Sequence, residues 1–65
     1  MPSTFECHLQ NWLEAERKFE EAAHACVEAI AADTPAIHDA LRELEARRRD
    51  AVEAMFAMTI AAAGR

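Results

Sequence analysis

Histidine, cysteine and glutamate side chains could bind a metal here, and their spacing decides whether they do. His24 and Cys26 are two residues apart, so on a helix they point to roughly opposite sides. Glu21 and His24 have the E-x-x-H spacing of di-iron helical bundles. The second half of the chain has no matching E-x-x-H unit. We therefore predict no metal ligand and no cofactor, and rank a metal-binding bundle third among the functional hypotheses.

Cys7 and His8 are the closest approach to a nucleophile beside a base. Neighbouring residues on a helix diverge by about 100°, and no third group orients this pair. A simple helical hairpin also lacks the concave pocket that holds a substrate. We predict no catalytic residue and no enzymatic activity.

Three consecutive arginines, Arg47, Arg48 and Arg49, are the residues that most suggest nucleic-acid binding. On a helix they point about 100° apart and cannot share one face. Arg47 and Arg49 each follow a glutamate by one turn, Glu43 and Glu45, an arrangement that supports a solvated helix surface. The run therefore indicates helix-stabilising ion pairs more than a phosphate-binding patch.

The charge distribution also argues against nucleic acid as the partner. The formal net charge of the 65 residues is −5. Residues 1–33 contain two basic and seven acidic residues, whereas residues 34–65 contain five of each. An acidic chain does not bind a phosphate backbone non-specifically. Residues 1–21 show no signal peptide, and no segment is apolar enough to span a membrane, so we expect a cytoplasmic protein that binds no membrane.

Two helices, at about 4–31 and 35–63, are expected to form a single domain over residues 1–65. Thr34 followed by Pro35 marks the break, because proline suits the first position of a helix and threonine the position before it. A lone core in a chain of this length rarely supplies more than about 3–5 kcal/mol. Composition and size therefore predict a helical protein that needs a partner.

Each helix carries an apolar stripe at heptad spacing. The stripe of the first helix contains Phe5, Leu9, Trp12, Glu16, Phe19, Ala23, Cys26 and Ile30. The stripe of the second contains Ile37, Leu41, Leu44, Arg48, Ala51, Met55, Met58 and Ala62. Folding the chain at the turn brings every member of one stripe opposite a member of the other. The fold predicted is an all-α antiparallel two-helix hairpin.

Glu16 and Arg48 are the two charged residues of these stripes, and they fall in adjacent layers of the hairpin. We predict that they form a buried polar pair, within one chain or between two, which fixes the register. Further apolar residues lie outside the stripes, and exposing them would leave a contiguous apolar patch. We therefore predict a homodimer, with two hairpins forming an antiparallel four-helix bundle.

The function predicted is a non-enzymatic protein–protein interaction module, such as a small adaptor, co-chaperone or inhibitor. Its partners would be a second copy and, through the apolar end away from the turn, another protein. The residues assigned to this interaction surface are Phe5, Leu9, Trp12, Leu13, Val52, Met55, Phe56 and Ile60.

Two resemblances follow from chain length and hairpin layout. A short chain with two amphipathic helices and a proline-containing turn is similar to the small co-chaperones of type III secretion needle subunits. A dimer of such hairpins also resembles in plan the plasmid-encoded Rop protein, a dimer that binds paired RNA loops. The second likeness implies the alternative function, a nucleic-acid-binding regulatory dimer.

Overall fold

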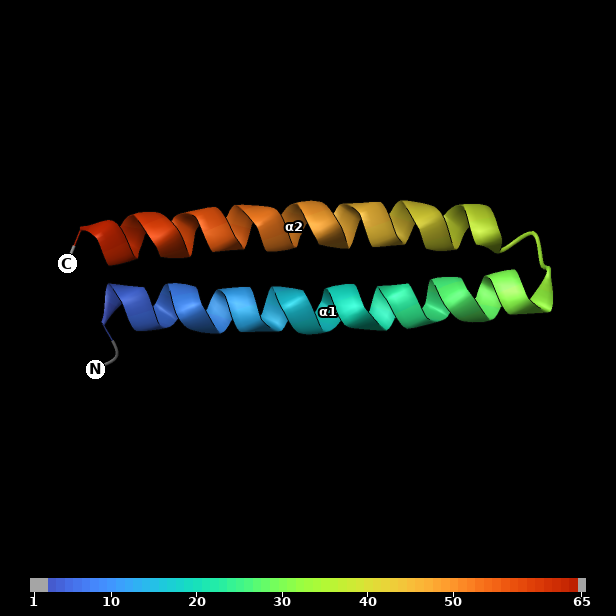
Figure 1. Ribbon diagram of the computed structural model, residues 1–65, viewed down its shortest axis with the longest axis horizontal. Coiled ribbons are helices and arrows are strands. Elements are labelled where there is room, and N and C mark those ends of the chain that lie inside the picture. The colour runs from blue at the N-terminus through green and yellow to red at the C-terminus, as the bar shows by residue number, and fades with distance from the viewer. Residues whose placement is uncertain (1–2, 65) are drawn as a thin grey trace.

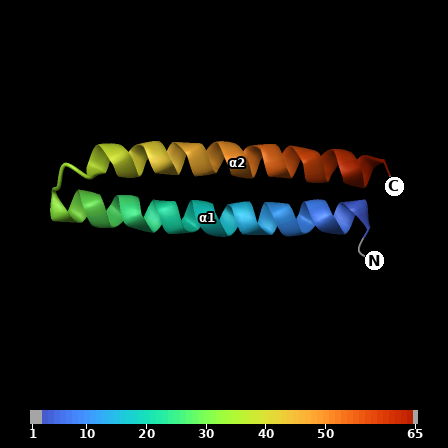
Figure 2. The same cartoon turned by 180° about the vertical axis from the view of Figure 1, so that it is seen from behind.

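A computed structural model describes residues 3–64 as two antiparallel helices joined by a short turn (Figure 1). Helix α1 runs over Thr4–Ala32 and helix α2 over Ile37–Ala63. The two chain ends lie at the same end of the hairpin, as both views show (Figures 1 and 2). The described part of the chain contains no strand, and the predicted all-α hairpin is confirmed. The other residues of the expected 1–65 domain lie outside the described range.

Local capping interactions mark the start of α1 and the end of α2. The Ser3 hydroxyl accepts a hydrogen bond from the Glu6 backbone N–H at 3.1 Å, and the Glu6 carboxylate accepts one from the Ser3 N–H at 3.3 Å. This reciprocal capping box satisfies two backbone donors that the first turn would otherwise leave free. Gly64 caps the end of α2, where its N–H donates to the Ile60 carbonyl at 3.1 Å.

Asp33 ends α1 by adopting a left-handed backbone conformation, with φ 51° and ψ 51°. Its N–H donates to the carbonyls of Ala29 and Ile30, which closes the last turn. Aspartate is one of the few residues other than glycine that enters this region readily. The helix therefore stops at Ala32, one residue beyond the expected end.

Helix α2 begins two residues later than the sequence predicted, at Ile37 instead of Pro35. Pro35 and Ala36 form a turn, in which the Ile37 N–H donates to the Thr34 carbonyl at 3.2 Å. The residue at the cap position is Ala36, and no side chain caps this end. The correction has a local cause: proline fixes its own φ and lacks an N–H, but these properties suit a tight turn as well as a first helical position.

The fully buried part of the contact between the two helices is made of small side chains, with larger side chains partly covered around it. Only Ala22, Cys26 and Ala51 are buried among the described residues. The partly covered positions of α2 are Ile37, Ala40, Leu44, Arg47, Ala54, Ala57, Met58 and Ala61. The predicted α2 stripe is therefore rotated: Leu41 and Met55 are 45% and 44% exposed, and alanines take their places beside α1. Small residues let two helices approach closely, and this approach leaves the larger side chains outside.

The resulting hairpin is long and thin. Its Cα atoms span 48 × 17 × 12 Å, with a radius of gyration of 14.8 Å. A compact domain of this length would have a radius of gyration of about 11 Å. Neither helix, over the residues described, is both long and apolar enough to cross a membrane.

Candidate protein-interaction site

One broad side of the hairpin, which we call the open apolar face, carries two adjoining hollows between α1 and α2. One hollow is lined by Glu16, Phe19, Arg48, Ala51, Val52 and Met55. The next is lined by Phe19, Leu41, Leu44, Glu45 and Arg48. Phe19 and Arg48 line both hollows, which makes the surface continuous across the middle of the hairpin.

Large apolar side chains surround these hollows and remain in contact with solvent. Leu13, Val27, Ile30, Leu41, Val52 and Met55 are each between 44% and 65% exposed. Leu13, Val27 and Ile30 lie within about 60° of Glu16 around the axis of α1, so they border the same face. Natural monomers rarely leave a contiguous apolar surface of this kind uncovered.

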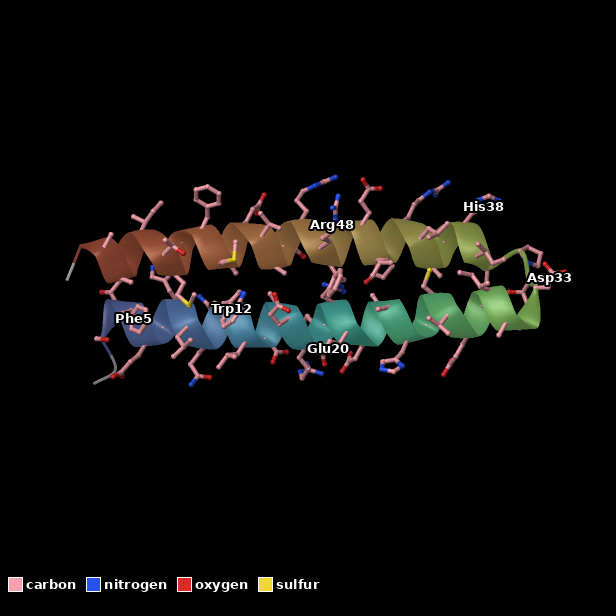
Figure 3. All side chains as sticks on the ribbon, in the orientation of Figure 1. Phe5, Trp12, Glu20, Asp33, His38 and Arg48 are labelled. Atoms are coloured by element: carbon pink, nitrogen blue, oxygen red, sulfur yellow. The ribbon has the colours of Figure 1, made fainter. Side chains whose placement is uncertain are left out.

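The interaction surface predicted from sequence divides into three parts. Phe5, Leu9 and Trp12 are partly covered within the hairpin. Figure 3 shows Phe5 and Trp12 on α1 towards the end away from the turn. Leu13, Val52 and Met55 are exposed and belong to the open apolar face. Phe56 and Ile60, the third part, lie elsewhere.

Phe56 and Ile60 form a separate outer pair on α2. They follow Ala51, which is buried against α1, by five and nine residues. These steps place them about 140° and 180° around the helix from Ala51, on the side away from α1. Their exposed fractions, 63% and 67%, agree with that position. Packing at the open apolar face would leave this pair uncovered.

Sequence reasoning missed part of the exposed surface because it placed Leu41 inside the hairpin. Leu41 is 45% exposed, and Val27 and Ile30 are 65% and 57% exposed, so apolar exposure continues to the turn end. The signal was present in Ala40 and Ala54, which directly precede the larger stripe residues Leu41 and Met55. An alanine row beside a row of large residues favours close helix packing on the alanine side.

Glu16 and Arg48, the predicted polar pair, both line the central hollow of the open apolar face. Glu16 is partly covered, whereas Arg48 is exposed near the middle of α2 (Figure 3). Among the described residues, neither a hydrogen bond nor an ion pair joins them. Their pairing inside an assembly stays a prediction.

The opposite side of the hairpin, which we call the charged face, carries groups of both signs. Its hollow between the helices is lined by Arg17, Lys18, Glu21, Ala22, Glu43 and Arg47. Arg47 binds Glu43 at 2.7 Å, which is the predicted pair, and its guanidinium lies 3.9 Å from Asp50. Such pairs stabilise an exposed helix by only a few tenths of a kcal/mol each.

Arg17 organises the charges of α1. Its guanidinium pairs with both Glu14 and Glu21, one turn away on either side. The hydrogen bond from Arg17 lowers the pKa of the Glu14 carboxyl, and Glu14 in turn raises the pKa of the Arg17 guanidinium. Lys18 follows Glu14 by four residues, but the closest partner of Glu14 is Arg17, whose planar fork suits a carboxylate better.

The three consecutive arginines do not form one basic patch. Arg47 lies on the charged face with Glu43, while Arg48 faces the open apolar face. Arg49 shares a third hollow with Glu45, Arg48, Val52 and Glu53, so acidic groups accompany it. Arg47 therefore lies on a different surface from Arg48 and Arg49.

Neither the cysteines nor the histidines assemble a reactive centre within residues 3–64. Cys26 is buried, Cys7 is exposed, and both are free thiols. No group of three or more His, Cys, Asp or Glu side chains in that range is arranged to hold a metal ion. The buried indole N–H of Trp12 has no hydrogen-bond partner in the described chain, a defect that typically costs about 1–3 kcal/mol.

Comparison with known proteins leaves the geometry of the hairpin as the guide to function. No protein-family model, no curated protein and no solved structure matches this chain.

Proposed function

We propose that this chain is a self-associating, non-enzymatic protein-interaction module. Two hairpins stack through their open apolar faces into an antiparallel four-helix bundle. The observation that carries the proposal is the contrast in burial: within residues 3–64, the three buried residues are two alanines and a cysteine, while eight large apolar side chains are exposed. A second hairpin would remove most of these side chains from water, which is the main favourable term in association.

The exposed area supports the same conclusion. The chain has an accessible surface of 5001 Å² for a mass of 7.2 kDa. A compact monomer of that mass exposes about 4,100 Å², so the hairpin has a surplus of about 900 Å². A stable protein–protein interface of standard size buries about 800 Å² on each partner. The surplus is therefore about what one such interface would cover.

The outer pair supports a second contact, made after the bundle has formed. Phe56 and Ile60 lie on the side of α2 away from α1, Phe56 at the outer edge of the open apolar face one turn after Val52, and both are more than half exposed. Aromatic and branched side chains one turn apart are the anchors that a helix inserts into an apolar groove. In this proposal the bundle displays the outer pair of each copy to another protein.

Nucleic acid is the alternative partner, and the charge distribution weighs against it. Arg47 is held by Glu43, and the hollow that contains Arg49 also contains Glu45 and Glu53. A phosphate-binding surface needs basic groups that are free to release counterions. The positions of these acids favour a protein partner.

Thermal unfolding at several protein concentrations tests the proposal. If the hairpin folds only as it associates, the midpoint measured by circular dichroism rises with concentration, because mass action couples association to folding. An unfolding midpoint that does not change between about 5 and 500 μM would contradict self-association as the source of stability. A gel-shift assay with structured RNA, compared before and after Arg47→Ala with Arg49→Ala, tests the alternative.

A further inference from the structure

The open apolar face has opposite charges at its centre. Glu16 and Arg48 line one hollow together with Phe19, Val52 and Met55, and no ion pair joins them in the described chain. Glu20, beside Phe19, and Glu45, beside Arg48, line the neighbouring hollows. Because both central groups stand on the surface proposed for self-association, a partner that covers this face must compensate their charges.

Compensation is required because burial of an unpaired charge is expensive. Removal of one partner of a buried pair is strongly destabilising, because it leaves an uncompensated charge in the interior. If the partner were wholly apolar, the charges of Glu16 and Arg48 could be compensated only by each other. A second copy brings its own Glu16 and Arg48, so the centre of the assembled interface contains two groups of each sign and is neutral. This charge complementarity favours a second copy as the occupant.

Two arrangements with two-fold symmetry can stack one hairpin on another. When the two-fold axis is parallel to the helices, α1 lies over the partner's α2 at the same height along the bundle. When the axis crosses the helices, α1 lies over the partner's α1 instead. Both arrangements place facing helices antiparallel, so the packing of helix backbones does not favour one arrangement over the other.

The central charges do distinguish the two arrangements. Glu16 and Arg48 lie in adjacent layers of the hairpin, close enough in height to line one hollow. With the axis parallel to the helices, Glu16 faces Arg48 of the partner copy, and Arg48 faces the partner's Glu16. With the axis across the helices, each glutamate approaches a glutamate and each arginine an arginine. Like charges brought together at an interface oppose association.

We infer that two copies stack with α1 over the partner's α2, and that Glu16 and Arg48 of both chains form one alternating ring at the centre of the interface. This inference rests on the proposed self-association and adds its geometry. The two ion pairs across the interface then specify orientation and register, a role that buried polar groups serve in helical bundles.

Mixing the natural chain with a charge-exchanged chain tests the arrangement. The exchanged chain carries Glu16→Arg together with Arg48→Glu, so each chain keeps opposite charges within itself. The two chains, one extended by a short mass tag, are unfolded together, refolded and measured by native mass spectrometry. The inferred arrangement places Glu against Glu and Arg against Arg in a mixed dimer, so mixed dimers fall about tenfold below the statistical one half.

A matched exchange on exposed positions of α1 provides the control. Glu14→Arg with Lys18→Glu also reverses two charges one turn apart, but Lys18 lines the hollow of the charged face and Glu14 is exposed. Mixing this variant with the natural chain should give the statistical share of mixed dimers. Sorting in the first mixture and not in the second supports the ring.

The other outcomes separate the inference from the proposal on which it rests. An excess of mixed dimers would show that α1 lies over the partner's α1, which overturns the inferred arrangement while self-association stands. A statistical share in both mixtures would show that Glu16 and Arg48 do not meet across the interface, which also overturns it. Monomers alone, from natural and exchanged chains, would overturn the proposed self-association as well.

Discussion

The two broad sides of the hairpin are formed by the same pair of helices, yet they differ in whether their side chains find partners within one chain. On the charged face, Arg17 pairs with Glu14 and Glu21, and Arg47 pairs with Glu43, so the polar groups have partners within the chain. On the open apolar face, Leu41 and Met55 are close to half exposed, and no ion pair within residues 3–64 joins Glu16 to Arg48. The comparison indicates that one side is complete in a single copy and the other is not.

The largest effect expected from this difference is on association. Leu41→Asp places a charge on the open apolar face, whereas Ala46→Asp places the same charge on an exposed position of α2 turned away from it. Full burial of a leucine contributes about 1.5–3 kcal/mol, and a two-fold dimer contains the site twice. We expect Leu41→Asp to weaken the dimer at least about 100-fold, as measured by sedimentation equilibrium.

The Ala46→Asp variant is the control for added charge and helix propensity. It should dimerise as the natural chain does, within about threefold. Equal weakening by both substitutions would show that charge alone opposes association and that the open apolar face is not the contact.

A second prediction concerns the alanine contact inside the hairpin. Ala51 is buried against α1, so Ala51→Leu forces the helices apart and should lower the free energy of unfolding by about 1–3 kcal/mol. Ala46→Leu adds the same atoms at an exposed site and should change it by less than about 0.5 kcal/mol. Chemical denaturation monitored by circular dichroism measures both. A stabilising Ala51→Leu would mean that α2 does not turn this position towards α1.

These alanines also show which parts of the structure the sequence could predict. The capping box at Ser3 and Glu6 depends on contacts between near neighbours, so its residue types were sufficient to predict it. The hairpin followed from two apolar stripes of matching length. The rotation of α2 was not predicted, because an apolar stripe at heptad spacing does not determine which of its two edges faces the neighbouring helix.

The start of α2 differs from the prediction, and the structure separates the predicted interaction residues into groups on different sides of the hairpin. Pro35 is compatible with both a turn and a first helical position, and in the structure it lies in a turn. Phe56 and Ile60 were assigned to one surface with Met55 because all three lie towards the end away from the turn, but their angles around the helix place Phe56 and Ile60 on the outer side of α2.

A third prediction separates the outer pair from the open apolar face. Phe56→Ser with Ile60→Ser removes the two most outward large side chains of α2. Because these positions lie on the outer side of α2, the dimerisation constant should change by less than about fivefold. Binding of any second protein through the outer pair should be lost in a pull-down with the intact dimer. Dissociation of the dimer as severe as that caused by Leu41→Asp would contradict this division of surfaces.

The smallest effect is expected on the charged face. Arg17 lowers the pKa of Glu14, so this pair stabilises the folded chain above the unfolded pKa of glutamate, and the contribution is lost as pH falls through the folded pKa. Arg17→Gln should slightly lower the thermal midpoint near neutral pH and have no effect at a pH where the acids are protonated. Both groups are exposed, so added salt should abolish the difference. A difference that persists in strong acid would contradict the ion-pair explanation.

Sedimentation equilibrium of the natural chain at micromolar concentration tests the central claim most directly, because it reports mass without any substitution. If two hairpins associate as proposed, the measured mass is twice the 7.2 kDa of one chain, and circular dichroism at the same concentration shows a helical protein. A species of 7.2 kDa that remains fully helical over the same range would contradict it, since the hairpin would then be stable with its apolar face in water.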